Sequence, residues 1–435
     1  MMRINRLFAV LSLLFVTSVV GFAQTGTWHG KISVQGIEIP LVFHFEAGGC
    51  TIDSPSQGVK GIPAVKSMKE DGTLRVDIKT INASYEGKME ENIIKGTFTQ
   101  NGFQLPLTLE AGQVVNNRPQ TPKAPFPYTE ENVSFKSDGY TLHGTLSLPK
   151  DCNENTPVVL MVTGSGQQNR DEELFEHKPF AVIADALARN GIASLRYDDR
   201  GWKDASVNFL DFTTEDFKHD AEAGVNFLRK RFEKVGVLGH SEGGTIALLL
   251  AAEGKPDFIV SLAGMAISAK ETLLDQNRQG MASIGLTDDM VNAYCAALDK
   301  AFDELAEGKP VNDIKADNVP ALLKPYFGKA LQQGDNRYFR NLFKVNPSQS
   351  LSKIKCPVLA LNGTKDTQVD CEKNLGTLKN GLKNSPHTVK QFDGLNHLFQ
   401  HCTTGSIVEY QQIEETISPE VLSTIVDWVK SGLKF

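Results

Sequence analysis

The sequence has none of the short motifs that indicate a metal ion or a nucleotide cofactor. Its six cysteines include no CxxC pair, and neither HExxH nor GxxxxGKS/T occurs. A zinc ribbon, a thioredoxin-like site, a zinc peptidase helix and a phosphate-binding loop are therefore not expected. Residues 164–169 are glycine-rich at their start but lack the third glycine of a dinucleotide-binding turn. We predict no cofactor and no metal.

Clusters of positive charge are missing as well. No Lys/Arg-rich block with interleaved aromatic residues occurs, and the formal net charge is −7. This balance argues against nucleic acid or an anionic membrane as a main partner. The expected partner is a small-molecule ester or another acylated substrate.

Long apolar runs are confined to the N-terminus. Arg3 and Arg6 precede the apolar run Leu7–Val20, and Gly21-Phe22-Ala23 has the small-x-small pattern of a cleavage site. We predict a signal peptide over residues 1–23 and export to the periplasm or the medium. The alternative is a retained anchor, for which the run is short, and no later segment is long and apolar enough to span a membrane.

Two composition patterns divide the rest of the chain. Residues 24–110 show apolar residues in alternation and many glycine turns, which predicts a small all-β domain with tight hairpins at Asp71-Gly72 and Asn101-Gly102. Residues 111–127 hold four closely spaced prolines and are predicted to be a semi-rigid linker.

Residues 128–435 alternate strand-like and helix-like segments. This pattern predicts an α/β domain with a mostly parallel sheet covered by helices. Val158–Val162 is a continuous apolar run, as a buried strand requires. Between the predicted strands 258–262 and 357–361 lie 94 residues, 263–356, although a crossover needs only about a dozen. We interpret the excess as a helical cap over about residues 265–350.

The strongest signal for chemistry is Gly239-His240-Ser241-Glu242-Gly243. It follows a predicted strand at 235–238 and precedes an Ala/Leu-rich helix. A serine at such a strand-to-helix turn is typical of a nucleophile elbow, whose glycines allow close packing around the Ser backbone. The alternative is an ordinary glycine-rich turn with Ser as a helix cap. His240 is expected to pack beneath the nucleophile.

An acid and a base follow later strands in the chain order Ser, Asp, His. Asp366 comes just after the strand at 357–361, and His397 comes just after the last strand, at 388–392. We predict that His397 takes the proton of Ser241 and that Asp366 orients its imidazole. Asp370 and His401 are the local rivals.

A tetrahedral intermediate also needs backbone donors for its oxyanion. We predict that one is the N–H of Glu242, directly after the nucleophile. The second is expected from the turn after the strand at 158–162, with the N–H of Ser165 or Gly166. The alternative is that this segment is a plain strand-to-helix turn.

At these residues the sequence resembles the α/β-hydrolase superfamily, and within it bacterial acyl esterases and serine-aminopeptidase-like hydrolases. The resemblance covers about residue 130 to the C-terminus. Trp202 and Lys203 depart from the small residues usual after Arg200-Gly201, at the rim of the pocket. The first domain resembles a β module that precedes such hydrolases in exported bacterial proteins. The matching motifs are Gly164–Gly166, Asn169–Glu172, Tyr197–Gly201, Gly239–Gly243, Asn362–Asp366 and Leu395–His397.

We therefore expect a serine esterase that cleaves carboxylic esters with small acyl groups. A peptidase or amidase with the same triad is an alternative. An aminopeptidase would need an acidic group for the free amine, for which Glu172, Glu173 and the acidic residues of the cap are candidates. An acyltransferase and a non-catalytic binding protein are further alternatives, and the β domain could contact glycan. Cys371 lies five residues after Asp366, and Cys402 lies five residues after His397. This equal spacing raises the hypothesis of a disulfide between the loop that carries the acid and the loop that carries the base.

Overall fold

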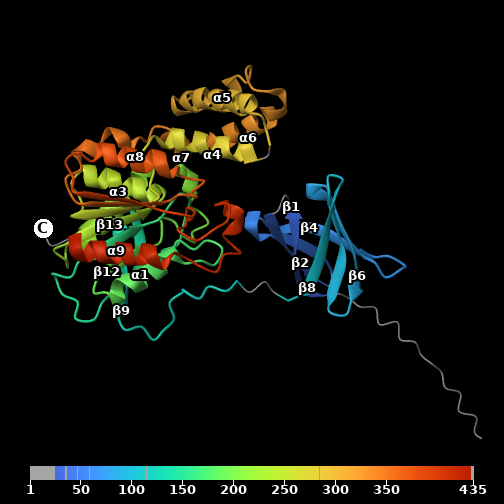
Figure 1. Ribbon diagram of the computed structural model, residues 1–435, viewed down its shortest axis with the longest axis horizontal. Helices are drawn as coiled ribbons and strands as arrows, with labels where there is room; N and C mark the ends of the chain where they lie inside the picture. The colour runs from blue at the N-terminus through green and yellow to red at the C-terminus, as the bar shows by residue number, and fades with distance from the viewer. Residues whose placement is uncertain are drawn as a thin grey trace, which may run out of the picture. The chain divides into compact units, whose positions relative to one another are not determined.

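The computed structural model describes residues 25–34, 37–46, 48–57, 59–112, 116–283 and 285–432. The predicted signal peptide, 1–23, lies outside this part of the chain. The chain divides into two compact units, with the boundary between Val115 and Asn116 (Figure 1). No helix among the described residues is long and apolar enough to cross a membrane.

The first unit is a closed barrel of eight antiparallel strands. β1 closes the barrel by pairing with β8, where Trp28 lies opposite Ala111. Closure removes the unpaired strand edges that an open sheet would expose. The interior is filled by apolar side chains, with Phe43 and Tyr85 fully buried at its centre. The strands are β1 (Gly26–Val34), β2 (Ile37–Phe45), β3 (Cys50–Ser54), β4 (Val59–Met68), β5 (Leu74–Ile78), β6 (Ala83–Glu90), β7 (Ile93–Gln100) and β8 (Phe103–Ala111).

One of the two predicted tight hairpins forms as expected. Asn101 and Gly102 alone join β7 to β8, with φ of 51° and 86°, as a two-residue primed turn requires. The prediction of a two-residue turn at Asp71-Gly72 is wrong, because of these two residues only Gly72 has a positive φ, 80°. There the chain makes a wider loop, which the N–H of Lys69 closes on the carbonyl of Thr73.

The second unit contains an eight-stranded sheet in the order β16-β15-β14-β13-β11-β12-β10-β9. β10 is antiparallel to both β9 and β12, and the other pairs are parallel. The prediction of a mostly parallel sheet is confirmed. Its strands are β9 (Thr129–Ser137), β10 (Tyr140–Leu148), β11 (Val158–Val162), β12 (Ala193–Tyr197), β13 (Val235–His240), β14 (Phe258–Leu262), β15 (Val358–Gly363) and β16 (His387–Phe392).

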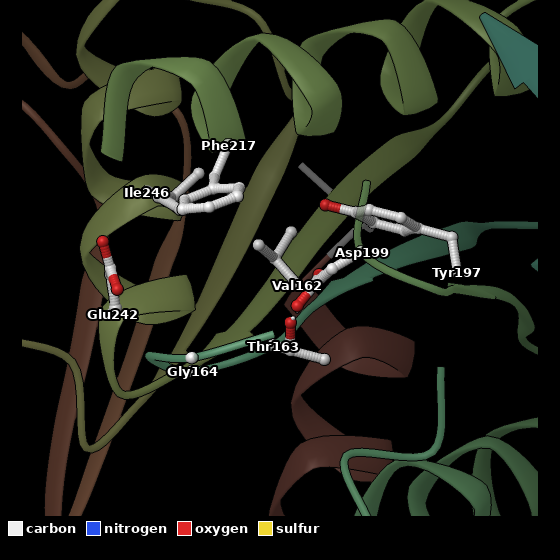
Figure 2. Close-up of a pocket in the computed structure, with 9 residues that line it drawn as sticks. Val162, Thr163, Gly164, Tyr197, Asp199, Phe217, Glu242 and Ile246 are labelled. Atoms are coloured by element: carbon white, nitrogen blue, oxygen red, sulfur yellow. Dashed lines mark hydrogen bonds between the residues drawn. The ribbon is translucent and has the colours of Figure 1, made fainter. Parts of the chain in front are cut away.

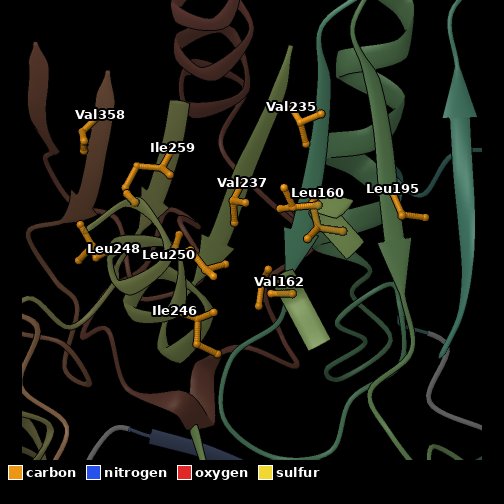
Figure 3. Packing of buried hydrophobic residues seen from close by; sticks show 14 of the residues in the cluster. Leu160, Val162, Leu195, Val235, Val237, Ile246, Leu248, Leu250, Ile259 and Val358 are labelled. Carbon is orange, nitrogen blue, oxygen red and sulfur yellow. The ribbon is translucent and has the colours of Figure 1, made fainter. Parts of the chain in front are cut away.

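Helices cover both faces of this sheet (Figure 1). α1 (Pro179–Arg189) and α9 (Pro419–Gly432) pack on one face. α2 (Thr214–Leu228), α3 (Glu242–Ala252) and α8 (Cys371–Gly381) pack on the other. Figure 3 shows side chains of α3 against those of the central strands. Burial from two sides explains why the central strands are continuously apolar. This is the α/β-hydrolase fold that the resemblance implied.

Further helices lie in the long interval between β14 and β15. They are α4 (Ala269–Ser283), α5 (Asp288–Ala306), α6 (Lys324–Gly334) and α7 (Arg337–Leu342). They share a core of their own, which includes Leu298, Phe302 and Leu331. An apolar stripe along α5 faces this core, since Val291, Tyr294, Leu298, Phe302 and Leu305 are all buried.

Candidate active site

Ser241 occupies the turn between β13 and α3. Its φ of 54° and ψ of −120° are rarely adopted by residues with a side chain and cost free energy that the surrounding packing must supply. A Cβ on Gly239 would overlap the backbone of Gly243, and one on Gly243 would lie 2.5 Å from the carbonyl oxygen of Thr163. The turn is therefore tightly packed and strained, as a nucleophile elbow is.

Asp366 and His397 are in direct contact. The Nδ1 of His397 lies 2.7 Å from one carboxylate oxygen of Asp366. The other oxygen accepts the N–H groups of Gln368 and Val369, at 2.8 and 2.9 Å. Both side chains are almost fully buried. With Nδ1–H donated to the carboxylate, Nε2 is the ring nitrogen left to accept a proton.

The two rivals are engaged elsewhere. Asp370 is the N-cap of α8 and accepts the N–H of Lys373 at 2.8 Å. The side chain of His401 is 68% exposed and pairs with Glu415 at 2.8 Å. Neither is joined to the other members of the predicted site.

No hydrogen bond joins Ser241 to His397 among the described residues. The ring of His240, next to Ser241 in the chain, lies 4.6 Å from that of His397. Hydrogen bonds of a catalytic site are commonly long or misaligned before substrate binds. The structure thus gathers all three predicted residues at one edge of the sheet, with the Asp–His contact already formed.

The loop after β11 is held by two carboxylates, of which Glu172 is buried and Asp199 is partly buried. Glu172 accepts the N–H of Gly164 at 2.7 Å. Asp199 accepts the hydroxyl of Thr163 at 3.0 Å and the N–H of Gln168 at 2.7 Å. Burial raises the pKa of Asp199 well above its usual range, although these two hydrogen bonds act in the opposite direction. The loop is therefore fixed from both of its ends.

The predicted oxyanion donors lie on this loop and on the first turn of α3. The N–H groups of Ser165, Gly166 and Glu242 have no acceptor within the described part of the chain. Gly166 has a φ of 97°, a conformation that few residues other than glycine adopt. Unpaired donors beside a strained serine suit the binding of a developing oxyanion.

The carboxyl group of Glu242 is a feature that the sequence did not reveal. It is buried and accepts the hydroxyls of Thr214 and Tyr338, at 2.7 and 2.5 Å, and that of Ser165. Burial raises the pKa of Glu242, and the three hydroxyls oppose this shift. Tyr338 belongs to α7, so this carboxyl joins the segment between β14 and β15 to the residue after Ser241.

A small cavity lies between Glu242 and Asp199 (Figure 2). The volume that the centre of a water-sized sphere can occupy in this cavity is only about 10 Å³, which is room for about one water molecule. An acyl group does not fit there. The cavity is lined by Val162, Thr163, Gly164, Gly166, Tyr197, Asp199, Phe217, Glu242 and Ile246.

Two predictions about this region are wrong. Glu172 was a candidate for binding a free amine, but it is buried and already bonded to Gly164 and His240. A disulfide between Cys371 and Cys402 is absent, since both are free thiols. Cys371 packs at the start of α8 in the core, whereas the thiol of Cys402 donates to the carbonyl of Gly394. Equal spacing from Asp366 and His397 did not bring the two sulfurs together.

The family model of the X-Pro dipeptidyl-peptidases (S15 family) matches residues 138–399. The chain belongs to this family. The matched range contains Ser241, Asp366 and His397, and membership places the chain among the serine hydrolases.

Three similar proteins carry the name esterase. Esterase EstD of Thermotoga maritima is 28% identical over 314 residues, which are 71% of this chain and 65% of that protein, so the chain spans about two thirds of it. Est1E from Butyrivibrio proteoclasticus is 18% identical, with 70% and 99% of the two chains covered and a TM-score of 0.41. Esterase Pf2001 of Pyrococcus furiosus is also 18% identical, with 74% and 98% covered and a TM-score of 0.42. Within the described ranges, no group of three or more His, Cys, Asp or Glu side chains could hold a metal ion.

Proposed function

We propose that the protein is a serine esterase that hydrolyses carboxylic esters with small acyl groups. The observation that carries the proposal is the buried 2.7 Å contact between His397 and Asp366 at the sheet edge where Ser241 sits in a strained turn. Free backbone donors lie beside the same turn.

The reaction follows from these positions. His397 accepts the hydroxyl proton of Ser241 as the oxygen attacks the ester carbonyl. The N–H groups of Glu242 and of Ser165 or Gly166 bind the oxyanion. His397 then gives its proton to the leaving alcohol, which leaves an acyl group on Ser241. A water molecule, activated by His397 in the same way, releases the acid.

The state of the buried acids favours an ester over a peptide with a free N-terminus. Capture of an ammonium group needs a carboxylate with unused acceptor capacity in the site. Glu172 and Glu242 are both buried and already hydrogen-bonded. Glu173, the other candidate, accepts the side-chain amide of Asn169 at 3.3 Å and pairs with Lys178 at 3.5 Å. The esterase relative agrees with this choice. The family description favours the second candidate, a peptidase that uses the same three residues.

The test is hydrolysis of p-nitrophenyl esters from acetate to octanoate, beside aminoacyl and Xaa-Pro p-nitroanilides. We expect ester turnover that is greatest for the shortest acyl groups and falls by at least ~10³-fold in Ser241→Ala. Ser423→Ala, an exposed helix serine, is the matched control and should keep full activity. Ester turnover that survives in Ser241→Ala contradicts the mechanism, and turnover of anilides alone would establish the peptidase instead.

A further inference from the structure

A buried histidine and a buried glutamate lie directly beneath the reacting groups. The Nδ1 of His240 is 3.0 Å from Oε1 of Glu172, and its Nε2 is 3.0 Å from the carbonyl oxygen of His397. The same Oε1 of Glu172 accepts the N–H of Gly164 at 2.7 Å. One side-chain pair therefore joins the oxyanion loop, the residue before Ser241 and the backbone of the base.

The proton positions on this pair follow from its partners. A carbonyl oxygen only accepts, so Nε2 of His240 carries a hydrogen for His397. Nδ1 and the Oε1 of Glu172 share one proton, and with the proton on either group the pair carries no net charge. Burial alone would lower the pKa of His240, but Glu172, the carbonyl of His397 and the charge of Asp366 together raise it.

If either Glu172 or His240 is replaced, the adjoining cavity offers no other side chain that could supply the lost hydrogen bond. Apart from the pair itself, the adjoining small cavity is lined by apolar residues, and almost no polar surface is present in it. A buried polar group that loses its partner in such a place keeps the full desolvation cost. These apolar residues are Pro179, Phe180, Ile183, Leu262, Leu398, Phe399 and Ile417.

We infer that Glu172 and His240 are positioning residues, which hold the oxyanion loop, the nucleophile and the base in one geometry. The inference rests on the proposed function of Ser241 and His397. Neither residue is aimed at the reacting atoms; each acts through Gly164 or through the backbone of His397. Because the pair is neutral overall, it also places no net charge beside the ring of His397, which must gain a proton during the reaction.

The test measures the rate at which a fluorophosphonate labels Ser241, together with kcat and KM for p-nitrophenyl acetate. We expect Glu172→Gln and His240→Gln each to lower the labelling rate and kcat by about 10- to 100-fold, with KM changed less than about twofold. Because the two residues act as a unit, the double variant should be no more than about threefold slower than the slower single variant.

The matched control is His177→Gln at pH 8. His177 is also fully buried, and its ring meets the carbonyl of Tyr410 and the hydroxyl of Thr416, both at 2.9 Å. The control should label at the wild-type rate within about twofold, even where its melting temperature falls. Single variants that label as fast as wild type, or a double variant whose loss is the product of the two single losses, would overturn the inference.

Folding failure and failure of the proposed function give different results. If His240→Gln does not fold, the comparison of Glu172→Gln with Glu172→Ala tests the inference instead. Only glutamine keeps an acceptor for the N–H of Gly164, so Ser241 should be labelled more slowly in Glu172→Ala than in Glu172→Gln. Wild-type labelling rates in both variants would overturn the inference. A wild-type protein that labels at Ser241 but cleaves no ester refutes the esterase, while its labelling rates still test the pair. A wild-type protein that does not label refutes both.

Discussion

The substitution Gly243→Ala tests whether close packing at the elbow sets the activity. Gly243 is the second residue of α3, where alanine would normally be favoured by about 1 kcal/mol for its helix propensity. Here the added Cβ would lie 2.5 Å from the carbonyl oxygen of Thr163 and closer still to that of Val162. Backbone atoms at the end of β11 cannot rotate away as a side chain could, so α3 and β11 must separate.

The required movement can be read from the structure. Ordinary contact with a Cβ begins at 3.4 Å, so α3 has to move at least 0.9 Å from Thr163. That separation pulls the N–H of Glu242 away from those of Ser165 and Gly166, the donors expected to bind one oxyanion. A misplacement of about 1 Å can cost about 10²-fold in rate, which corresponds to about 2.7 kcal/mol of transition-state stabilisation.

The assay is kcat/KM on p-nitrophenyl acetate, with urea unfolding of the same preparations. We expect Gly243→Ala to lose about 10²-fold in kcat/KM and to unfold more easily than wild type. Gly376→Ala is the control, since Gly376 is within α8 and its Cβ would meet nothing within 4 Å; it should keep its activity and gain stability. Retention of activity within threefold in Gly243→Ala would refute the argument from packing.

Two further predictions concern stability. Tyr338→Phe removes one hydrogen-bond donor from the buried carboxyl of Glu242 and should lower the free energy of unfolding by about 1.5–3 kcal/mol, measured in urea. The control is Tyr326→Phe, which should change the free energy of unfolding little because Tyr326 is 48% exposed. Burial lowers the pKa of His177 from 6.5 to about 4. Because the pKa of His177 is depressed in the folded protein, its contribution to the free energy of unfolding is complete above pH 6.5 and is lost as the pH falls from 6.5 through 4. The free energy of unfolding of wild type relative to His177→Gln should therefore drop by about 3 kcal/mol over that range, and a difference that does not vary with pH would refute this.

The parts of the site that sequence reasoning reached depend on local context. Ser241, Asp366 and His397 each come after a predicted strand, and the carboxyl ends of parallel strands meet at one edge of a sheet. Asp366 and His397 are indeed in contact, and their catalytic roles stay predictions. Sequence reasoning left Asp370 as a rival of Asp366, and only the structure identifies Asp370 as the N-cap of α8, bonded to the N–H of Lys373. The signal peptide also stays a prediction, outside the described residues.

Other features were out of reach because they join distant segments. Glu172 and His240 are 68 residues apart, and Tyr338 and Glu242 are 96 apart. Periodicity detects which side chains face a core but not which polar groups meet inside it. β9 was not separated as a strand because most of its side chains are exposed.

The same contacts explain how the site can be ready before substrate arrives. Preorganised donors lower a barrier because they need no rearrangement when charge develops. Glu172 and Asp199 hold the loop that carries Ser165 and Gly166, and Glu242 takes hydroxyls from this loop, from α2 and from Tyr338 in α7. A shift of α7 would therefore act on the residue that follows Ser241. Through this one carboxyl, the segment between β14 and β15 is joined to the residue whose N–H is expected to bind the oxyanion.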